Sequence, residues 1–237
     1  LAYALLRRYH QVGILDLDYR TPNVPVMMDD QNKGLDHSFD GDILIPPMIN
    51  GIRVMSMAYI WPLWKCVQVS DEQAMDDVVH LLKPGIIEWG ALDYLVVDTP
   101  PTSVGVVEVA LQAEDLLGAV LVTHASRVAR MDAIRTIDLF REKEVPILGM
   151  VCNQEGMHDL VADDMARIAQ EFGLPMFAVV PHVFPREAGP GLVPHFDAIV
   201  DKLLTVTPVT LKVPQTEDRN WKALLQALEM LSGRKNN

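Results

Sequence analysis

The stretch Leu92-Asp-Tyr-Leu-Val-Val-Asp-Thr-Pro-Pro101 is the part of the chain that is most informative about the fold. Its apolar run favours a buried strand, and the acid that ends the run is followed by two stiff prolines. A carboxylate at such a strand end can hold magnesium through water beside a triphosphate, as in the Walker B motif. We therefore predict Asp98 as a magnesium ligand. The loop that would sense phosphate then begins with Thr99, Pro100 and Pro101.

Similar short apolar runs recur along the chain, and each is followed by a segment with helical spacing. Near-continuous apolarity indicates strands that are covered on both faces, which is typical of parallel sheets flanked by helices. We predict strands at 12–16, 52–57, 92–98, 119–123, 147–152 and 176–180, and helices at about 71–82, 104–114, 127–143, 159–172 and 194–204. This alternation predicts an α/β fold, a doubly wound and mostly parallel sheet flanked by helices, with ligands at the carboxyl ends of the strands.

The predicted domain organisation is simple. A chain of 237 residues with 49% apolar composition can bury one large core, and residues 1–205 are assigned to a single nucleotide-switch domain. Residues 206–237 are expected to form a connector and a short helix around 221–231. The segment 29–42 is rich in Asp, Gly and Asn, and we expect it to be a mobile surface loop.

Charge and cysteine content restrict the partners and the compartment. The 32 acidic and 20 basic residues give a net charge of -12, which opposes binding to nucleic acids and to anionic membranes. Only two cysteines occur, Cys66 and Cys152, both in apolar surroundings, which favours a reducing cytoplasm over a disulfide framework. No apolar run approaches the roughly 20 residues that span a bilayer, so we expect a soluble cytoplasmic protein without a membrane partner.

A second pair of acids follows the first predicted strand. Asp16 and Asp18 lie two residues apart, so an extended chain places them on the same side, where they can share a hydrated cation or position a water. The alternative is a turn in which an Asp caps the next segment. The position at a strand end favours the functional interpretation.

Several of these segments together resemble the Mrp/ApbC family of deviant P-loop ATPases, relatives of MinD and ParA. The resemblance rests on Leu92 to Pro101 and on Val12-Gly-Ile-Leu-Asp-Leu-Asp18, and further similar segments follow in order at 51–56, 118–135 and 145–151. It runs from about Leu1 to Leu204. It implies a P-loop NTPase fold of the SIMIBI type and an ATP-dependent dimeric switch that carries or assembles iron-sulfur clusters.

The resemblance also implies roles for individual residues. Asp16 or Asp18 would lie in switch I and assist the attacking water, and Asp98 would be the magnesium carboxylate that opens switch II. Asn153 falls where the family recognises adenine through a side-chain amide, although a residue that caps a turn after a strand remains an equal alternative. The loop implied to flank the adenine consists of Pro181, His182 and Val183.

The start of the chain departs from the family pattern. Leu1-Ala-Tyr-Ala-Leu-Leu6 resembles the middle of the family's first helix, and no Gly-Lys-Ser or Gly-Lys-Thr occurs in the sequence. We expect that a central strand and a phosphate loop have been lost by truncation, since a sheet without that strand has two unpaired edges. ATP hydrolysis is predicted only if the loop exists in the full-length protein. The alternative is a non-catalytic homologue that binds a partner.

The cysteine pair of the family is also missing. After Cys152 the chain continues Asn153-Gln-Glu-Gly-Met-His158, without the Cys-x-x-Cys pair that holds a bridging iron-sulfur cluster in the family. Such clusters need several thiolates, so no iron-sulfur ligand is identified and cluster carriage by this chain stays open. The partners implied are a second copy or a related subunit, which would form a homodimer or heterodimer, and an apo-protein client.

Overall fold

The structure is a computed structural model. It describes residues 1–29, 34–38, 41, 43–60, 70–100, 104–111, 116–157, 162–183 and 188–206. Pro101 and the helix expected around 221–231 lie outside the described residues.

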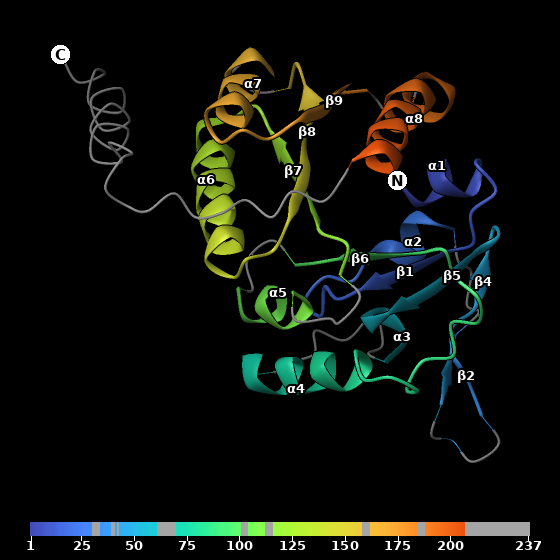
Figure 1. The fold of residues 1–237 in the computed structure, drawn as a ribbon. Coiled ribbons are helices and arrows are strands. Elements are labelled where there is room, and N and C mark those ends of the chain that lie inside the picture. The colour runs from blue at the N-terminus through green and yellow to red at the C-terminus, as the bar shows by residue number, and fades with distance from the viewer. Residues whose placement is uncertain are drawn as a thin grey trace.

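Two largely parallel sheets form the centre of the fold (Figure 1). The first has the order β4-β5-β1-β6 and consists of β4 (Met48–Ile49), β5 (Ile52–Ser56), β1 (Val12–Asp16) and β6 (Tyr94–Asp98), with β4 alone antiparallel to its neighbour. The second has the order β7-β8-β9 and consists of β7 (Ala119–His124), β8 (Ile147–Glu155) and β9 (Met176–Pro181). The predicted α/β class is confirmed.

Helices cover both sheets. They are α1 (Ala2–Leu6), α2 (Val24–Met27), α3 (Met57–Ile60), α4 (Asp71–Leu81), α5 (Val104–Ala110), α6 (Arg127–Glu142), α7 (Ala162–Glu171) and α8 (Ala188–Thr205). Serine side chains at Ser70 and Ser126 accept backbone hydrogen bonds at the starts of α4 and α6, as N-caps do. Among the described helices, none has the length and apolarity that crossing a membrane requires.

Each sheet has an edge strand, β6 in the first and β7 in the second, that lacks a partner on one side among the described residues. Within the described residues, β6 pairs only with β1 and β7 pairs only with β8. Val122 on β7 is 61% exposed and Leu95 on β6 is 40% exposed, so apolar side chains of both edge strands reach solvent.

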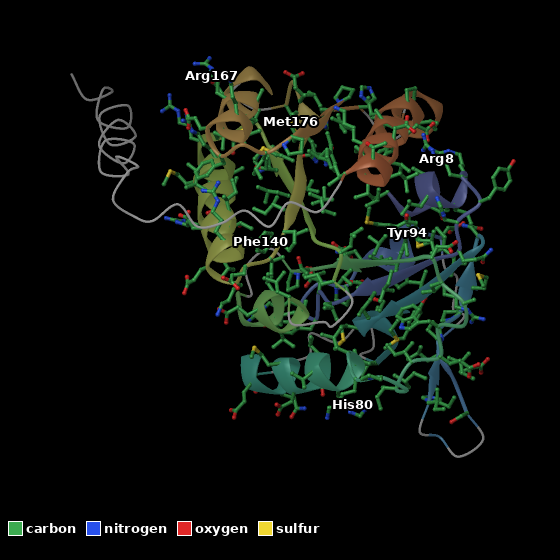
Figure 2. All side chains as sticks on the ribbon, viewed as in Figure 1. Arg8, His80, Tyr94, Phe140, Arg167 and Met176 are labelled. Carbon is green, nitrogen blue, oxygen red and sulfur yellow. The ribbon has the colours of Figure 1, made fainter. Side chains whose placement is uncertain are left out.

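A shared core holds the sheets together where strand pairing does not. One buried cluster joins Ile52 and Val12 of the first sheet to Phe177 of the second, and it continues into α1 and α8 through Leu5 and Val200. Arg8, just after α1, donates to Asp197 and Asp201 of α8 (Figure 2). Packing under α1 and α8 thus replaces a continuous hydrogen-bonded sheet.

Each sheet also has a core of its own on the opposite side. Helices α6 and α7 cover the second sheet through Ile137, Phe140 and Ile168. Helices α4 and α5 cover the first sheet through Val78 and Val106. Besides the shared core, the structure therefore has two separate cores, one for each sheet.

Several predicted boundaries were wrong. Helix α8 begins at Ala188, not at 194, and contains Pro194 in its interior, because Leu192 adds apolar contact with the core and extends the helix backwards. The segment 29–42 was expected to be only a loop, but β2 (Asp36–His37) pairs there with β3 (Leu44–Ile45). Strand 52–57 ends at Ser56, because Met57 starts α3.

Close packing within the second sheet gives a first prediction. Gly149 of β8 lies against the ring of Phe177, which is 1% exposed, and a Cβ at this position would overlap that ring. We expect Gly149→Ala to lower the free energy of unfolding by about 1 to 3 kcal/mol, since a buried ring has little room to move. Denaturant unfolding measures this loss. Adding Phe177→Leu should recover part of it, and an unchanged midpoint for Gly149→Ala would contradict the packing.

Candidate nucleotide site

Three polar residues end three neighbouring parallel strands of the first sheet. Asp16 is the register partner of Ser56 on β5 and of Asp98 on β6, so the three side chains stand in a row at the carboxyl edge. Parallel strands bring their carboxyl ends to one edge, which is where ligands of open α/β sheets bind. The structure thus brings together the two acids that the sequence singled out.

Asp16 is the buried centre of this row, with 1% of its surface exposed. Ser56 Oγ donates to Asp16 Oδ2 over 2.7 Å, and the backbone N–H of Asp18 donates to Oδ1 over 3.1 Å. The N–H of Val24 adds a longer bond of 3.4 Å to Oδ2. The carboxylate is therefore held in one orientation by donors from β5, the loop after β1 and the start of α2.

Burial raises the pKa of the Asp16 carboxyl group above its ordinary value. The donated hydrogen bonds, first that from Ser56, lower this pKa only in part, and the nearby Asp98 carboxylate raises it further. A carboxylate whose pKa is raised beside other acids accepts a proton readily, and a nearby cation stabilises its charged form.

Asp98 is an exposed residue at the end of β6. Its backbone carbonyl accepts from the N–H of Leu17, which ties the end of β6 to the segment after β1. The pKa of Asp98 is also raised, first by partial burial of the carboxyl group and then by the charge of Asp18. Two acids that repel each other at an accessible position favour a divalent cation between or beside them.

Asp18 has a role that the sequence left open. Its side chain accepts from the backbone N–H groups of Arg20 and Thr21 and from the Thr21 hydroxyl at 2.8 Å. These bonds stabilise the loop after β1, which is the turn-capping alternative. Because its charge also acts on Asp98, Asp18 belongs to the same site while shaping the loop.

The ligand atoms at this site fit a magnesium ion bound beside a phosphate better than a metal ion held by protein side chains alone. In the part of the chain that the structure describes, no three His, Cys, Asp or Glu side chains converge to hold a metal. Magnesium at phosphate sites usually has one or two carboxylates, with water and phosphate oxygens as the other ligands. Asp98 offers such a carboxylate, whereas the oxygens of Asp16 already accept three hydrogen bonds.

The residues expected around adenine belong to the second sheet. Strand β8 does not end at Cys152 but continues to Glu155, so Asn153 lies within the strand, in register with His124, and the turn-capping alternative is wrong for it. The strand is longer because Glu155 pairs with Pro181 of β9, and Gln154, with a φ of 55°, absorbs the irregularity between them. His182 follows, and its N–H donates to the Glu155 carbonyl at 2.8 Å.

Asn153 and the segment from Pro181 to Val183 therefore lie at neighbouring strand ends. Asn153 is half-buried, His182 is exposed and Val183 is half-buried. Thr99 is exposed and Pro100 buried directly after Asp98, at the start of the predicted phosphate-sensing loop.

Cys152 does not have the character of an exposed metal ligand. It is fully buried in β8, and burial raises the pKa of its thiol, with Glu155 adding to the rise. Clusters of iron and sulfur bind thiolates, which a buried neutral thiol does not supply. The other cysteine, Cys66, lies outside the described residues.

Ser56 is the site residue that sequence interpretation missed. It ends an apolar strand in the same way as Asp16 and Asp98 do, and that polar end of the run Val54-Met-Ser56 was the available signal. Its function depends on a partner 40 residues away, and only the strand register shows that pairing.

We expect Ser56→Ala to lower the free energy of unfolding by about 1.5 to 3 kcal/mol, the range for a hydrogen bond to a charged group. The reason is that Asp16 Oδ2 would lose its shortest bond while remaining buried. Denaturant unfolding at neutral pH measures the loss. Ser56→Thr, which keeps the hydroxyl, serves as the comparison, and equal losses for both variants would show that size and not the hydrogen bond matters.

Parallel strands with polar residues at their carboxyl ends are typical of nucleotide-binding α/β proteins, and the family match over residues 1–180 identifies the class as P-loop NTPase. The septum site-determining protein MinD from Pyrococcus horikoshii, solved with Mg-ADP, shares this fold with a TM-score of 0.61 and 18% identity, covering 86% of this chain and 88% of that one. Residues 1–180 match the ParA family described as NUBPL iron-transfer P-loop NTPase. The chain belongs to this family.

Two relatives share more of the sequence. The iron-sulfur cluster carrier protein of Deinococcus radiodurans is 36% identical over 174 residues, which cover 73% of this chain and 48% of that protein. The iron-sulfur cluster transfer protein NUBPL of Mus musculus is 34% identical over 193 residues, which cover 75% of this chain and 57% of that protein. The chain thus spans about half the length of the curated relatives it matches.

Proposed function

We propose that this protein is an ATP-dependent switch of the Mrp/ApbC type that serves the carriage or assembly of iron-sulfur clusters. The observation that carries the proposal is the row of Asp16, Ser56 and Asp98 at the ends of three adjacent parallel strands. Open α/β sheets bind their ligands at this edge, and the acids there suit a magnesium-bound triphosphate. A reducing, cytoplasmic setting fits the acidic composition and the buried Cys152.

In this proposal each of the three acids has its own role in binding the nucleotide. Asp98 would hold magnesium, and the bound ion would neutralise charge on the phosphate oxygens. Asp16, fixed by Ser56 and by the loop after β1, would orient the attacking water and accept its proton. Asp18 keeps that loop in place.

Nucleotide recognition is assigned to the second sheet. The Asn153 amide offers both a donor and an acceptor, which match the edge of adenine, and the segment Pro181 to Val183 flanks the base. The loop that begins with Thr99 and Pro100 follows Asp98 directly, so we expect a change in the phosphates of the bound nucleotide to alter the conformation of this loop first. Phosphoryl transfer needs mainly such positioning and charge stabilisation.

Iron-sulfur clusters enter as cargo, and the support is family membership and the names of the relatives. Because Cys152 is buried with a raised thiol pKa, we assign no cluster ligand to it. Cluster transfer would then involve a dimer, either of two copies or with a related subunit, and an apo-protein client.

The test uses the full-length protein. Calorimetry should show binding of ATP that tightens when magnesium is present, and phosphate release should show slow hydrolysis. A reconstituted cluster should pass to an apo-protein faster with ATP than without it. If ATP neither binds nor is hydrolysed, the switch proposal is wrong and a non-catalytic partner-binding protein is the better description.

A further inference from the structure

Helix α6 begins at the carboxyl edge of the second sheet, next to a residue assigned to adenine. The hydroxyl of Thr123, near the end of β7, donates over 3.4 Å to the carbonyl of Ala129 in the first turn of the helix. His124, the last residue of β7, is the register partner of Asn153 on β8. Because neighbouring strands are only about 4.8 Å apart, a ligand bound at Asn153 lies within reach of the start of α6.

Arg130 lies on the face of α6 that packs against the second sheet. The buried residues of this face are Ala133, Ile134, Ile137 and Phe140. Arg130 precedes Ala133 and Ile134 by three and four residues, so it continues their stripe toward the start of the helix. The Cα–Cβ bonds of a helix tilt toward its start, which is here the carboxyl edge of the sheet. The side chain of Arg130 thus leaves the helix on its core side at this edge.

The Nε nitrogen of Arg130 is buried, and among the described residues it has no hydrogen-bond acceptor. Arginine keeps its charge in proteins, and every nitrogen of its guanidinium group is a donor. A buried donor without an acceptor destabilises the folded protein, so native structures rarely contain one without a reason. An anion that supplies the acceptor when it binds would be such a reason.

The charges around the start of α6 also favour an anion. The first turn holds no acidic residue and begins with Arg127. The nearest acid along the helix, Asp132, forms an ion pair of 3.1 Å with Arg135. A cation at the start of a helix is opposed by the helix dipole, whereas an anion is stabilised there. In a protein with a net charge of -12, this helix start is therefore a local site of positive charge.

We propose that Arg130 binds a phosphate group of the nucleotide whose base lies at Asn153. The inference rests on the proposed function and adds to it a phosphate-binding residue from the second sheet. In a nucleotide the ribose and phosphates follow directly on the base, so a base at Asn153 brings a phosphate group to the neighbouring strand end. A guanidinium group can donate two parallel hydrogen bonds to phosphate oxygens.

Calorimetry of the full-length protein tests this assignment. We expect Arg130→Gln to weaken the binding of Mg-ATP by about tenfold to a hundredfold, the effect of losing a hydrogen bond between charged groups. The affinity for adenosine, which has no phosphate, should stay the same. Arg130→Lys should recover only part of the affinity for Mg-ATP, because it restores the charge without the planar pair of donors.

Arg135→Gln is the matched control. It removes the same charge from the same helix, but the Arg135 guanidinium group is exposed and lies beside Asp132. The affinity of this variant for Mg-ATP should stay within about twofold of the wild-type value. An equal loss in Arg130→Gln and Arg135→Gln would show that the total charge of α6 matters and would overturn a specific contact of Arg130.

The stability of the nucleotide-free protein separates ligand binding from a structural role. Arg130→Met keeps much of the apolar stem and removes the buried donor, so its midpoint of denaturant unfolding should equal or exceed that of the wild type. Mg-ATP should then raise the midpoint of the wild type more than that of the variant. A lower midpoint without nucleotide, together with equal stabilisation of both proteins by Mg-ATP, would assign Arg130 to the fold alone and overturn the proposal.

Inorganic tripolyphosphate distinguishes this inference from the function on which it rests. It should raise the unfolding temperature of the wild type and not that of Arg130→Met. Mg-ATP binding that is unchanged in Arg130→Gln would overturn the role of Arg130 and leave the switch proposal standing, with a carboxylate of a partner protein as the better anion. Stabilisation by tripolyphosphate that needs Arg130, in a protein that does not bind ATP, would contradict the proposed function and support the phosphate site.

Discussion

Asp98→Asn in the full-length protein is expected to reduce magnesium-dependent ATP hydrolysis by about 100-fold or more, the scale for losing one preorganised electrostatic contact. Asparagine keeps the size of the side chain and removes the charge that attracts magnesium. The site then retains the buried Asp16 and its hydrogen bonds, so the fold should persist. Steady-state phosphate release, measured over a range of magnesium concentrations, gives the change.

Asp93 offers a matched control near the other end of the same strand. It is exposed, and its carboxylate accepts from the N–H of Gln11 at 2.8 Å, a bond that an asparagine can also accept. Asp93→Asn should therefore hydrolyse ATP at the wild-type rate. Equal rates for Asp98→Asn and Asp93→Asn would remove Asp98 from the site, and a loss that excess magnesium restores would confirm its role as a ligand.

Asp16→Asn is expected to reduce hydrolysis by about 100-fold or more and to change how stability depends on pH. The loss of activity has the magnitude of removing a positioned general base. The pH dependence changes because burial raises the pKa of Asp16 in the folded protein, so folding favours the protonated carboxyl group and opposes the carboxylate. An amide of the same shape carries no charge to bury, but it has one acceptor oxygen where the carboxylate uses two.

The sign of the pH effect follows from the same shift. The stabilising contribution of Asp16 is complete below its unfolded pKa, about 3.9 for an ordinary aspartate, and is lost as pH rises through the raised folded pKa. The stability of Asp16→Asn relative to the wild type should therefore fall on acidification. Denaturant unfolding at several pH values, with phosphate release measured in parallel, gives both quantities.

Asp138→Asn is a control that separates the effect on the pH dependence of stability from the effect on hydrolysis. Burial on α6 also raises the pKa of Asp138, with Arg141 opposing the rise, and Asp138 lies away from the acids at the strand ends. Asp138→Asn should change the pH dependence of stability in the same direction and leave hydrolysis unchanged. Full hydrolysis by Asp16→Asn would show that this buried carboxylate only supports the structure.

Local patterns in the sequence were sufficient for the main elements. Strand 12–16 has the predicted bounds, and predicted helix 127–143 corresponds to α6, Arg127–Glu142. Apolar runs, helical spacing and capping serines act over a few residues, so the sequence carries them directly. The sequence was less reliable where a distant partner changes the local preference, as at Pro194 inside α8.

For the site, the sequence by itself determined which acids stand at strand ends, because a buried apolar run that stops at a carboxylate is a local feature. Only the tertiary structure decided that Ser56 fixes Asp16 and that β8 continues through Asn153. These relations join residues far apart in the chain. Strand register and packing set them, and neither is written in any single segment.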